Sequence, residues 1–516
     1  MVARDAYDML IVGGGINGAG IARDAAGRGL SVLLVEQDDL AAHTSSMSTK
    51  LIHGGLRYLE HYEFRLVREA LQERERLMAI APHLVQPLRF VLPIDTTIRP
   101  DWMVRIGLFL YDHLARRKSL PGSVAVDLSR DPRGEPLRAD NRRGFEYSDC
   151  SVDDARLVVL NALDAKERGA RIWVGARLDS ARRIDGQWVA TITDLSGGGR
   201  EEVSARVLVN AAGPWVADVL NRRVGLASGK HVRLVKGSHL LLPRFFDGEQ
   251  AYILQNPDKR IVFAIPYRER YALVGTTDVP YEGSPTEVTI SPEEIDYLVQ
   301  SINHWFKRQF APSEIVWTYS GVRPLFDDGS INASAVTRDY VFDIDAKDGA
   351  PPLLSVFGGK LTTYRRLAEH AMRDLARFLP GLKPSWTADA PLPGGDIPNG
   401  DMARFVDDLL AAKPFLGLPL ANRLARAYGT RARKVLGSSQ SLQDLGRDFG
   451  GGLFEAELEY LRAEEWARAS DDVLWRRTKL GIGAPPERAA AIDGFFRTAA
   501  RPAAHPRAGL GPEPAP

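Results

Sequence analysis

The five residues His53-Gly54-Gly55-Leu56-Arg57 place a titratable base, a flexible backbone and a fixed cation within one short stretch. A histidine can accept a proton near neutral pH, and an arginine can hold an anion through parallel hydrogen bonds. Residues of the same chemical types recur in four later stretches, Lys236–His239, Gly275–Asp278, Val322–Leu325 and Gly358–Tyr364. These stretches hold the candidate catalytic residues of the chain.

A glycine-rich motif near the N-terminus predicts a dinucleotide site. Gly13, Gly15 and Gly18 have G-x-G-x-x-G spacing and follow the apolar run Met9–Val12. A helix of small residues and a second apolar run follow, and that run ends at Glu36. This is a βαβ unit, in which the helix N-terminus binds phosphate and the acidic residue accepts hydrogen bonds from a ribose. The unit does not distinguish NAD from FAD, but Glu36 argues against the 2′-phosphate of NADP.

The hydroxyl-rich stretch Thr44–Lys50 follows this unit. Hydroxyl and backbone N–H groups beside a dinucleotide site can bind pyrophosphate or a flavin ring, whereas on composition alone the serines suit helix caps in a polar loop. A strand ending in Asn210-Ala211-Ala212-Gly213 is a second place where backbone can approach a cofactor. The glycine pair Gly358-Gly359 before a helix offers a further helix N-terminus to a ligand.

The strands that must position these residues form two groups. Parallel-type apolar strands are predicted near the N-terminus, at Val203–Val209 and at Leu353–Phe357. Between them, alternating patterns predict an antiparallel sheet, with strands at His231–Leu242, Ala251–Leu254, Ile261–Ile265 and Tyr271–Gly275. An NAD-binding domain is usually one continuous block, so the interrupted layout favours a flavoprotein in which the inserted sheet forms the substrate side of the flavin.

Four helical regions complete the pattern. Phe64–Ala81 is amphipathic, and Ser151 with Asp154 has the spacing of a capping box that begins a helix ending near Gly169. Ser291–Phe310 is a third helix. Trp102–His113 is apolar and aromatic, with Arg116-Arg117-Lys118 after it; it suits either a core helix with a basic end or a helix on a membrane surface.

The fold class is therefore α/β, with an interrupted FAD-binding Rossmann-like domain, an inserted antiparallel sheet and a C-terminal helical domain. We expect the FAD-binding domain at 1–85, 145–225 and 320–385, and the substrate domain at 86–144 and 226–319. A proline- and glycine-rich linker at 391–395 precedes the helical domain at 396–498. The tail at 499–516 is rich in Ala, Pro and Gly and is predicted to be disordered.

Composition excludes several classes of protein. A length of 516 residues predicts two or three domains, and a net charge of +1 gives no basic excess for a nucleic-acid partner. The single cysteine, Cys150, excludes an internal disulfide and a cysteine-rich metal site, and we interpret it as a packed thiol in a reducing cytoplasm. No stretch is apolar enough to span a bilayer, and the chain begins almost directly with the βαβ unit, so we expect a cytoplasmic protein.

Seven motifs together resemble those of one enzyme family. They are GGGINGAGIARDAAGRGL, STKLIHGGLRYLE, YSDCSVDDARL, NAAGPW, WTYSGVRPL, SVFGGKLTTYRRLAEHA and WRRTKLG. With these motifs the chain closely resembles the FAD-dependent glycerol-3-phosphate dehydrogenases, respiratory enzymes of the glycine oxidase/D-amino-acid oxidase-like superfamily. The resemblance covers about residues 7–478 and does not include the tail.

The resemblance implies oxidation of sn-glycerol 3-phosphate to dihydroxyacetone phosphate, with hydride transfer to FAD and reoxidation by a membrane quinone. It implies a peripheral enzyme on the cytoplasmic face of the inner membrane, for which Trp102–Lys118 and the C-terminal helices are candidate contacts. A homodimer is left open. The rival interpretations are an oxidase of the same superfamily that uses O2, for glycerol 3-phosphate or another substrate, and a flavin-containing binding or RNA-modifying protein.

The resemblance also assigns site residues. Arg57, Arg323 and Arg338 are expected to bind the phosphate, with Tyr58, Thr276 and Lys360 beside the substrate. His53 and His239 are alternative bases, and Lys360 is expected to stabilise negative charge on the flavin or substrate. Contacts to FAD are assigned to Gly13, Gly14, Gly15, Asn17, Gly18, Glu36, Thr44, Ser45, Ser46, Ser48, Lys50, Leu51, Ala212, Gly213, Gly359, Leu361 and Thr362. Met47 interrupts the serine cluster, where small residues are more usual, and is in doubt as a flavin contact.

Overall fold

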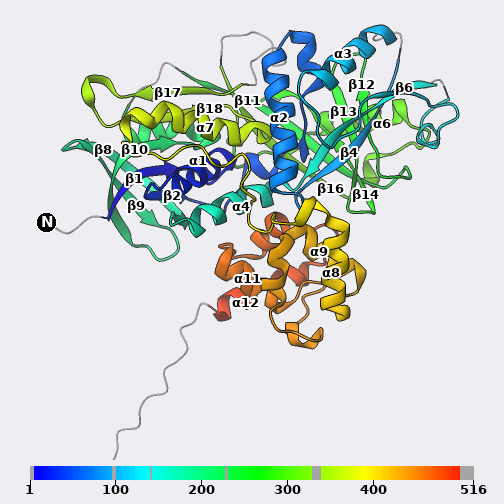
Figure 1. Ribbon diagram of the computed structural model, residues 1–516. Coiled ribbons are helices and arrows are strands. Elements are labelled where there is room, and N and C mark those ends of the chain that lie inside the picture. The colour runs from blue at the N-terminus through cyan, green and yellow to red at the C-terminus, as the bar shows by residue number, and fades with distance from the viewer. Residues whose placement is uncertain (1–4, 96–99, 140–141, 227–229, 328–338, 500–516) are drawn as a thin grey trace, which may run out of the picture.

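The computed structural model describes residues 5–95, 100–139, 142–226, 230–327 and 339–499, and contains two β-sheets and a helical C-terminal region (Figure 1). The central strands of the first sheet are parallel and run in the order β18-β10-β1-β2-β7. Their bounds are β1 Asp5–Val12, β2 Val32–Glu36, β7 Arg171–Val174, β10 Arg200–Asn210 and β18 Leu353–Phe357. The sheet is therefore assembled from three distant parts of the chain, as the interrupted pattern predicts.

Three helices share one hydrophobic core with this sheet, and their bounds are α1 Ile16–Gly27, α4 Asp154–Glu167 and α7 Tyr364–Leu375. Small residues let them approach closely: a Cβ on Gly20 of α1 would lie 2.7 Å from the ring of Tyr364 in α7. Three further strands pair antiparallel: β17 (Val341–Asp345) pairs with β18, and β9 (Gln187–Asp194) pairs with both β10 and β8 (Ala176–Ile184). The packing fixes the N-terminus of α1 at the carboxyl edge of the parallel strands.

The second sheet is mostly antiparallel and follows the order β15-β11-β14-β13-β12-β4-β6-β3, with β16 on β11 and β5 on β6. Its strands are β3 Leu51–Ile52, β4 Val85–Pro93, β5 Val124–Asp127, β6 Arg143–Val152, β11 Val232–Pro243, β12 Ala251–Gln255, β13 Ile261–Tyr267, β14 Tyr271–Gly275, β15 Val279–Pro280 and β16 Trp317–Phe326. Strands β3, β6 and part of β16 thus join this sheet although the expected ranges grouped their residues with the FAD-binding domain. The domain bounds themselves stay a prediction.

Helices α2 (Phe64–Ile80), α3 (Asp101–His113) and α6 (Pro292–Trp305) accompany the second sheet. Two predicted helix boundaries are wrong. Ser151 pairs with Leu51 in the sheet, and the side chain of Asp153 caps α4 instead, because it accepts a hydrogen bond from the Arg156 amide. Helix α6 ends at Trp305, before Phe310, because the chain turns extended at Phe306.

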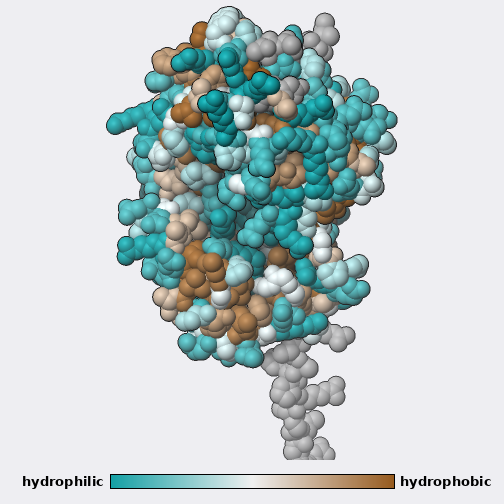
Figure 2. Space-filling view, turned by 90° about the vertical axis from the view of Figure 1, so that its right-hand side faces the viewer, coloured by the Kyte–Doolittle hydropathy of each residue, from teal (hydrophilic) through white to brown (hydrophobic). Residues whose placement is uncertain are grey.

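The C-terminal helices lie below the first sheet and beside α4 (Figure 1). They are α8 Met402–Ala412, α9 Gly417–Tyr428, α10 Ala432–Leu436, α11 Glu455–Glu464 and α12 Pro486–Ala499, and they form a hydrophobic cluster of their own. The face in Figure 2 is mainly hydrophilic, with apolar side chains gathered at its lower end over this helical region. The predicted disorder of the tail concerns residues that, from 500 on, lie outside the described ranges.

Helix α3 confirms the predicted helix, whereas its interpretation as a helix on a membrane surface stays a prediction. Val104, Leu108 and Tyr111 are buried, whereas Trp102, Ile106 and Phe109 are 61%, 52% and 59% exposed. One face therefore packs on the core and the other carries unpaired apolar surface. Cys150 is fully buried, and burial raises the pKa of its thiol, as expected of a packed cysteine.

Candidate active site

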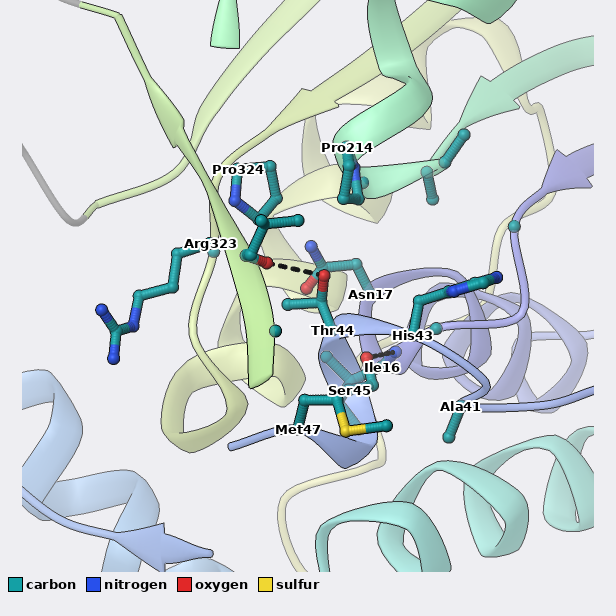
Figure 3. Close-up of a pocket in the computed structure, with 18 of the residues that line it drawn as sticks. Ile16, Asn17, Ala41, His43, Thr44, Ser45, Met47, Pro214, Arg323 and Pro324 are labelled. Atoms are coloured by element: carbon teal, nitrogen blue, oxygen red, sulfur yellow. Dashed lines mark hydrogen bonds between the residues drawn. The ribbon is translucent and has the colours of Figure 1, made fainter. Parts of the chain in front are cut away.

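One large cavity extends between the two sheets, with a volume of about 400 Å³, which is within the range of small-molecule sites. Its walls come from the glycine turn after β1, the hydroxyl-rich loop, the ends of β10 and β16, and the loop after β18. In Figure 3, Arg323 and Ala41 lie on opposite sides of the view, with Asn17, Thr44 and Met47 between them. The residues predicted to bind cofactor and those predicted to bind substrate therefore share one cavity.

The glycine motif forms the turn at the end of the cavity where the nucleotide is predicted to bind. Gly13 has a φ of +111°, and a Cβ there would lie 2.5 Å from the Ala211 carbonyl oxygen. A Cβ on Gly18 would lie 1.9 Å from the Gly13 oxygen, so this position requires glycine for helix–strand packing. Helix α1 begins directly after Gly15; its first turn contains no acidic residue, and one of its amides, that of Ile16, is bonded to Ser45 Oγ. Its N-terminus is thus suited to bind a pyrophosphate.

Glu36 ends β2 at the cavity wall. One carboxylate oxygen accepts a hydrogen bond from the Gly14 amide at 2.6 Å and the other accepts one from the Asp38 amide at 2.8 Å. Burial raises the pKa of this carboxyl, and the two amide bonds oppose that effect. Each oxygen retains a second acceptor site, so a ribose hydroxyl can still bind.

The loop of residues 37–50, here called the flavin loop, holds both the helix and the substrate sheet. Ser45 Oγ accepts a hydrogen bond from the Ile16 amide at 3.0 Å, and Thr44 Oγ1 donates one to the Val322 carbonyl at 2.8 Å (Figure 3). The hydroxyl groups of Thr44 and Ser45 therefore position the first turn of α1 and strand β16 around the cavity. The helix-cap interpretation is partly right, because Ser45 satisfies an N-terminal amide of α1.

The stretch that carries His53 and Arg57 is positioned by two glycines. The Gly54 amide donates a hydrogen bond to the Tyr111 hydroxyl at 2.8 Å, and that hydroxyl donates in turn to Asp149. Gly55 has a φ of +77°, and a Cβ there would lie 2.2 Å from the ring of Tyr58. The backbone thus folds tightly and lets His53 and Tyr58 face the cavity.

A cation beside hydroxyl groups lines the wall formed by the second sheet. Arg323 Nη1 lies 2.5 Å from Asp278 Oδ1, and Nη2 donates to Thr276 Oγ1 at 3.0 Å. A Cβ on Gly237 would lie 2.4 Å from Arg323 Nη2, so this glycine makes room for the guanidinium. Asp278 and Thr276 thus fix the orientation of the guanidinium at the cavity wall, and the carboxylate of Asp278 offsets part of its positive charge.

Lys360 supplies a second cation. Its Nζ lies 3.9 Å from the centroid of the Tyr58 ring, a distance that gives a cation–π interaction. The preceding loop is fixed by Asn17, whose side-chain amide donates to the Gly358 carbonyl at 3.1 Å. The ammonium and the Tyr58 ring thus form part of the same wall as His53.

The second candidate base, His239, lies behind the wall. It is buried, its ring stacks on Tyr319 at 4.7 Å, and its Nε2 lies 2.9 Å from Thr49 Oγ1. Thr49 itself lines the cavity. Burial, together with the charges of Arg323 and Lys50, holds the pKa of His239 well below its usual value. It is therefore neutral at physiological pH, and its hydrogen bond to Thr49 links it to the cavity.

Most of the predicted site residues line the cavity: Gly13, Gly15, Asn17, Glu36, Thr44, Ser45, Ser48, Leu51, His53, Tyr58, Ala212, Gly213, Thr276, Arg323, Gly359, Lys360, Leu361 and Thr362. Among the described lining residues, six predicted ones are not found: Gly14, Gly18, Ser46, Lys50, Arg57 and His239. The Lys50 ammonium instead lies in the core, 2.9 Å from Asp154. The expected roles of these residues stay predictions, and Arg338 lies outside the described residues.

Several lining residues were not predicted, among them His43, Thr49, Arg177, Trp215 and Phe263. Met47, which was in doubt, also lines the cavity and packs against Gly321, where a Cβ would lie 2.5 Å from its own. A local signal exists for His43 and Thr49, since they flank the hydroxyl-rich stretch. Arg177 and Phe263 lie on strands whose facing direction the sequence does not reveal.

Comparisons with known proteins agree with this geometry. The model of the FAD dependent oxidoreductases matches residues 8–365, and that of the C-terminal domain of alpha-glycerophosphate oxidase matches residues 385–503. A glycerol-3-phosphate dehydrogenase of Pseudomonas aeruginosa is 54% identical over 494 residues, which cover 96% of each chain. The chain belongs to the FAD-dependent glycerol-3-phosphate dehydrogenase family.

Two further relatives show the breadth of this family. A D-erythritol 1-phosphate dehydrogenase of Brucella abortus is 52% identical over 496 residues, covering 96% of this chain and 99% of that one. A crystal structure of the glycerol-3-phosphate dehydrogenase of Bacillus halodurans, complexed with FAD, superposes with a TM-score of 0.74 at 26% identity, covering 96% and 94% of the two chains. The family's cofactor is FAD, and a glycine turn, a helix N-terminus and an acidic residue such as Glu36 are the features that bind the ADP half of a dinucleotide.

Proposed function

We propose that this family member oxidises the secondary hydroxyl of sn-glycerol 3-phosphate to the ketone of dihydroxyacetone phosphate and passes the electrons to a membrane quinone. The observation that carries the proposal is the pair of cations, Arg323 and Lys360, in one cavity with His53 and the dinucleotide cradle. The 54% identical relative named glycerol-3-phosphate dehydrogenase supports the choice of substrate. When bound, FAD supplies the acceptor for the hydride that leaves C2.

Arg323 is suited to bind the phosphate. A dianion needs fixed, charge-assisted donors, and the guanidinium is held by Asp278 and Thr276 so that little side-chain entropy is lost on binding. Gly237 keeps the space around it open. Arg57 and Arg338 stay in the proposal as further phosphate ligands on the resemblance alone.

Hydride loss from C2 also requires that the hydroxyl proton leave, and two histidines are candidates for its acceptor. His53 lines the cavity, whereas His239 is neutral and hydrogen-bonded to Thr49. His239 could accept a proton only through the Thr49 hydroxyl, in one relayed step. Lys360 would stabilise the negative charge that develops on the substrate oxygen. The geometry favours His53 as the direct base.

The quinone requires that the enzyme reach a bilayer. None of the helices in the described ranges combines the length and the apolar composition of a membrane span. Helix α3 offers a surface contact instead: Trp102, Ile106 and Phe109 are exposed on one face, and Arg105 is exposed among them. An apolar face with a basic border binds anionic membrane surfaces. This surface supports our proposal that the protein associates peripherally with the cytoplasmic face of the membrane.

A second candidate substrate is D-erythritol 1-phosphate, because a relative with that name is 52% identical over almost its whole length. The two polyol phosphates share the phosphate and the oxidised secondary hydroxyl, so the residues described above would serve both. Comparing kcat/KM for the two substrates decides between them. A higher kcat/KM for D-erythritol 1-phosphate would overturn the proposed substrate but not the proposed chemistry.

The electron acceptor is tested separately. The enzyme is reduced with glycerol 3-phosphate and then mixed with a quinone analogue or with O2. The proposal predicts fast reoxidation by quinone and slow release of peroxide. Fast, stoichiometric formation of peroxide would instead identify an oxidase.

A further inference from the structure

The segment Trp475–Gly481 at the end of the C-terminal helical region contributes none of the described cavity-lining residues, yet its side chains reach three parts that build the cavity wall. The segment overlaps a π-helical turn, Asp472–Arg477. It lies where the C-terminal helices meet the first sheet, next to α4 (Figure 1). Its function is not explained by the chemistry of the site.

The first of these contacts is to the flavin loop. Asp39 follows Glu36 by three residues, and its carboxylate is held by two arginines. Arg477 Nη1 and Nη2 bind its two oxygens at 2.6 and 2.7 Å, and Arg476 Nε lies 2.5 Å away. Burial alone would raise the pKa of Asp39, but the two guanidiniums hold it below its usual value. Asp39 is therefore ionised and fixed from the C-terminal side.

The second contact lies below the hydroxyl cluster. Asp154 at the start of α4 accepts hydrogen bonds from Ser48 Oγ at 2.8 Å and from Lys50 Nζ at 2.9 Å. Lys50 also donates to the Ser46 carbonyl at 2.9 Å. Lys479 Nζ lies 3.7 Å from Asp154, and all three charged side chains are buried. Lys479 Nζ also lies 3.7 Å from Asp153 Oδ1, so two lysines face two aspartates in the network that holds residues 46–50.

The third contact is to the substrate sheet. Trp475 stacks on Trp317 with ring centroids 4.7 Å apart and an interplanar angle of 17°. Trp317 begins β16, the strand that carries Arg323 and whose Val322 carbonyl accepts the hydrogen bond from Thr44. The segment therefore touches the flavin loop and the strand to which that loop is bonded.

We propose that Trp475–Gly481 acts as a brace that holds the flavin loop and β16 in the conformation that retains FAD. Its residues are positioning residues, because none of them lines the described cavity, and each acts through Asp39, Asp154 or Trp317. The loop closes one side of the cavity with Thr44, Ser45 and Ser48, so its loosening lets the cofactor leave faster. FAD affinity thus depends on the C-terminal region, which supplies no described cofactor-facing side chain.

The experiment measures release of FAD in the absence of substrate, so it is independent of the proposed function. Holoenzyme is diluted, and the rise of flavin fluorescence gives the dissociation rate. Arg477→Met removes the bidentate bond to Asp39. Arg476→Met and Lys479→Met are less disruptive variants, and they test the proposal if Arg477→Met does not fold. We expect each folded variant to release FAD at least tenfold faster, and Arg476→Lys to stay within about threefold of the wild type.

Arg423→Met is the matched control. Arg423 forms a comparable, largely buried ion pair with Glu457, at 2.6 Å, but both residues lie inside the C-terminal region. We expect this variant to release FAD at the wild-type rate even if its unfolding temperature falls. Release within twofold of wild type in Arg476→Met and Lys479→Met, or equally fast release from Arg423→Met, would overturn the brace.

Discussion

At the residue scale, Arg323 is the most specific prediction for substrate binding. Arg323→Ala removes a charge-assisted contact of about 1.5–3 kcal/mol, so we expect KM for glycerol 3-phosphate to rise about tenfold or more. FAD should stay bound, because Arg323 belongs to the substrate sheet. Arg233→Ala is the control, since Arg233 on β11 forms an ion pair with Asp327, which directly follows β16, and does not line the described cavity. An unchanged KM in Arg323→Ala would refute the phosphate assignment.

The two candidate bases, His53 and His239, differ in their position relative to the cavity, so their substitution should affect kcat differently. His53→Ala should lower kcat by about tenfold or more, because a general base contributes on the order of 100-fold. His239→Ala should act more weakly, because His239 is not among the described lining residues and is linked to the cavity through Thr49. Steady-state rates at saturating substrate measure both effects. If His239→Ala lowers kcat as strongly and Thr49→Val reproduces it, the relay through Thr49 is the proton path; if neither histidine matters, neither is the base.

Residue types and local spacing were sufficient to predict the glycine turn and Glu36 at one end of the cavity. The glycine turn and Glu36 lie within 24 residues of one another in sequence, and their geometry depends on a single βαβ unit. The positions of His239 and Lys50 could not be predicted in this way. Which face of β11 meets the cavity depends on sheet packing, and Lys50 turns inward because its φ of +60° and its pairing with Asp154 direct it below the loop.

At the element scale, α3 is predicted to be the membrane contact. Replacing Trp102, Ile106 and Phe109 by Glu should reduce binding to anionic vesicles at least tenfold, because each side chain loses apolar burial of about 1.5–3 kcal/mol. Vesicle sedimentation measures the binding. Activity with a soluble dye as acceptor should not change, since the buried face of α3 keeps the bond between Tyr111 and Gly54.

Leu418→Glu with Leu442→Glu is the control for this experiment, because both leucines are exposed apolar residues of the C-terminal region. Vesicle binding that survives the α3 substitutions but is lost in the control would place the membrane contact on the C-terminal helices instead. The existence of α3 was predictable from its composition. Its exposure was not, because a largely apolar stretch does not show which face the rest of the chain covers.

At the scale of the whole molecule, stability should fall on acidification because buried histidines are neutral. Burial and the charge of Arg156 lower the pKa of His83 to about 3. An unfolded histidine titrates near 6.5, so between the two values the unfolded state binds the extra proton and gains stability. Lowering the pH from 6.5 to about 5 should therefore reduce the free energy of unfolding by about 2 kcal/mol through this one group.

Thermal unfolding midpoints between about pH 5 and 7 test this dependence. His83→Gln should show a shallower loss of stability on acidification than the wild type, whereas His304→Gln, at an exposed histidine, should follow the wild type. Equal slopes in all three proteins would show that His83 does not control the acid limit. His83 is buried between α2 and the C-terminal helices, and this burial could not be predicted from the local sequence pattern. The contacts across this boundary join residues hundreds of positions apart, such as Arg156 and Glu465.

The central claim is that one cavity brings a polyol phosphate to FAD. An anaerobic titration of the purified holoenzyme with sn-glycerol 3-phosphate tests it most directly. We predict that the visible absorbance of the oxidised flavin bleaches with one substrate per FAD and that dihydroxyacetone phosphate forms in equal amount. A flavin that remains oxidised at saturating glycerol 3-phosphate, although dithionite reduces it, would contradict the account.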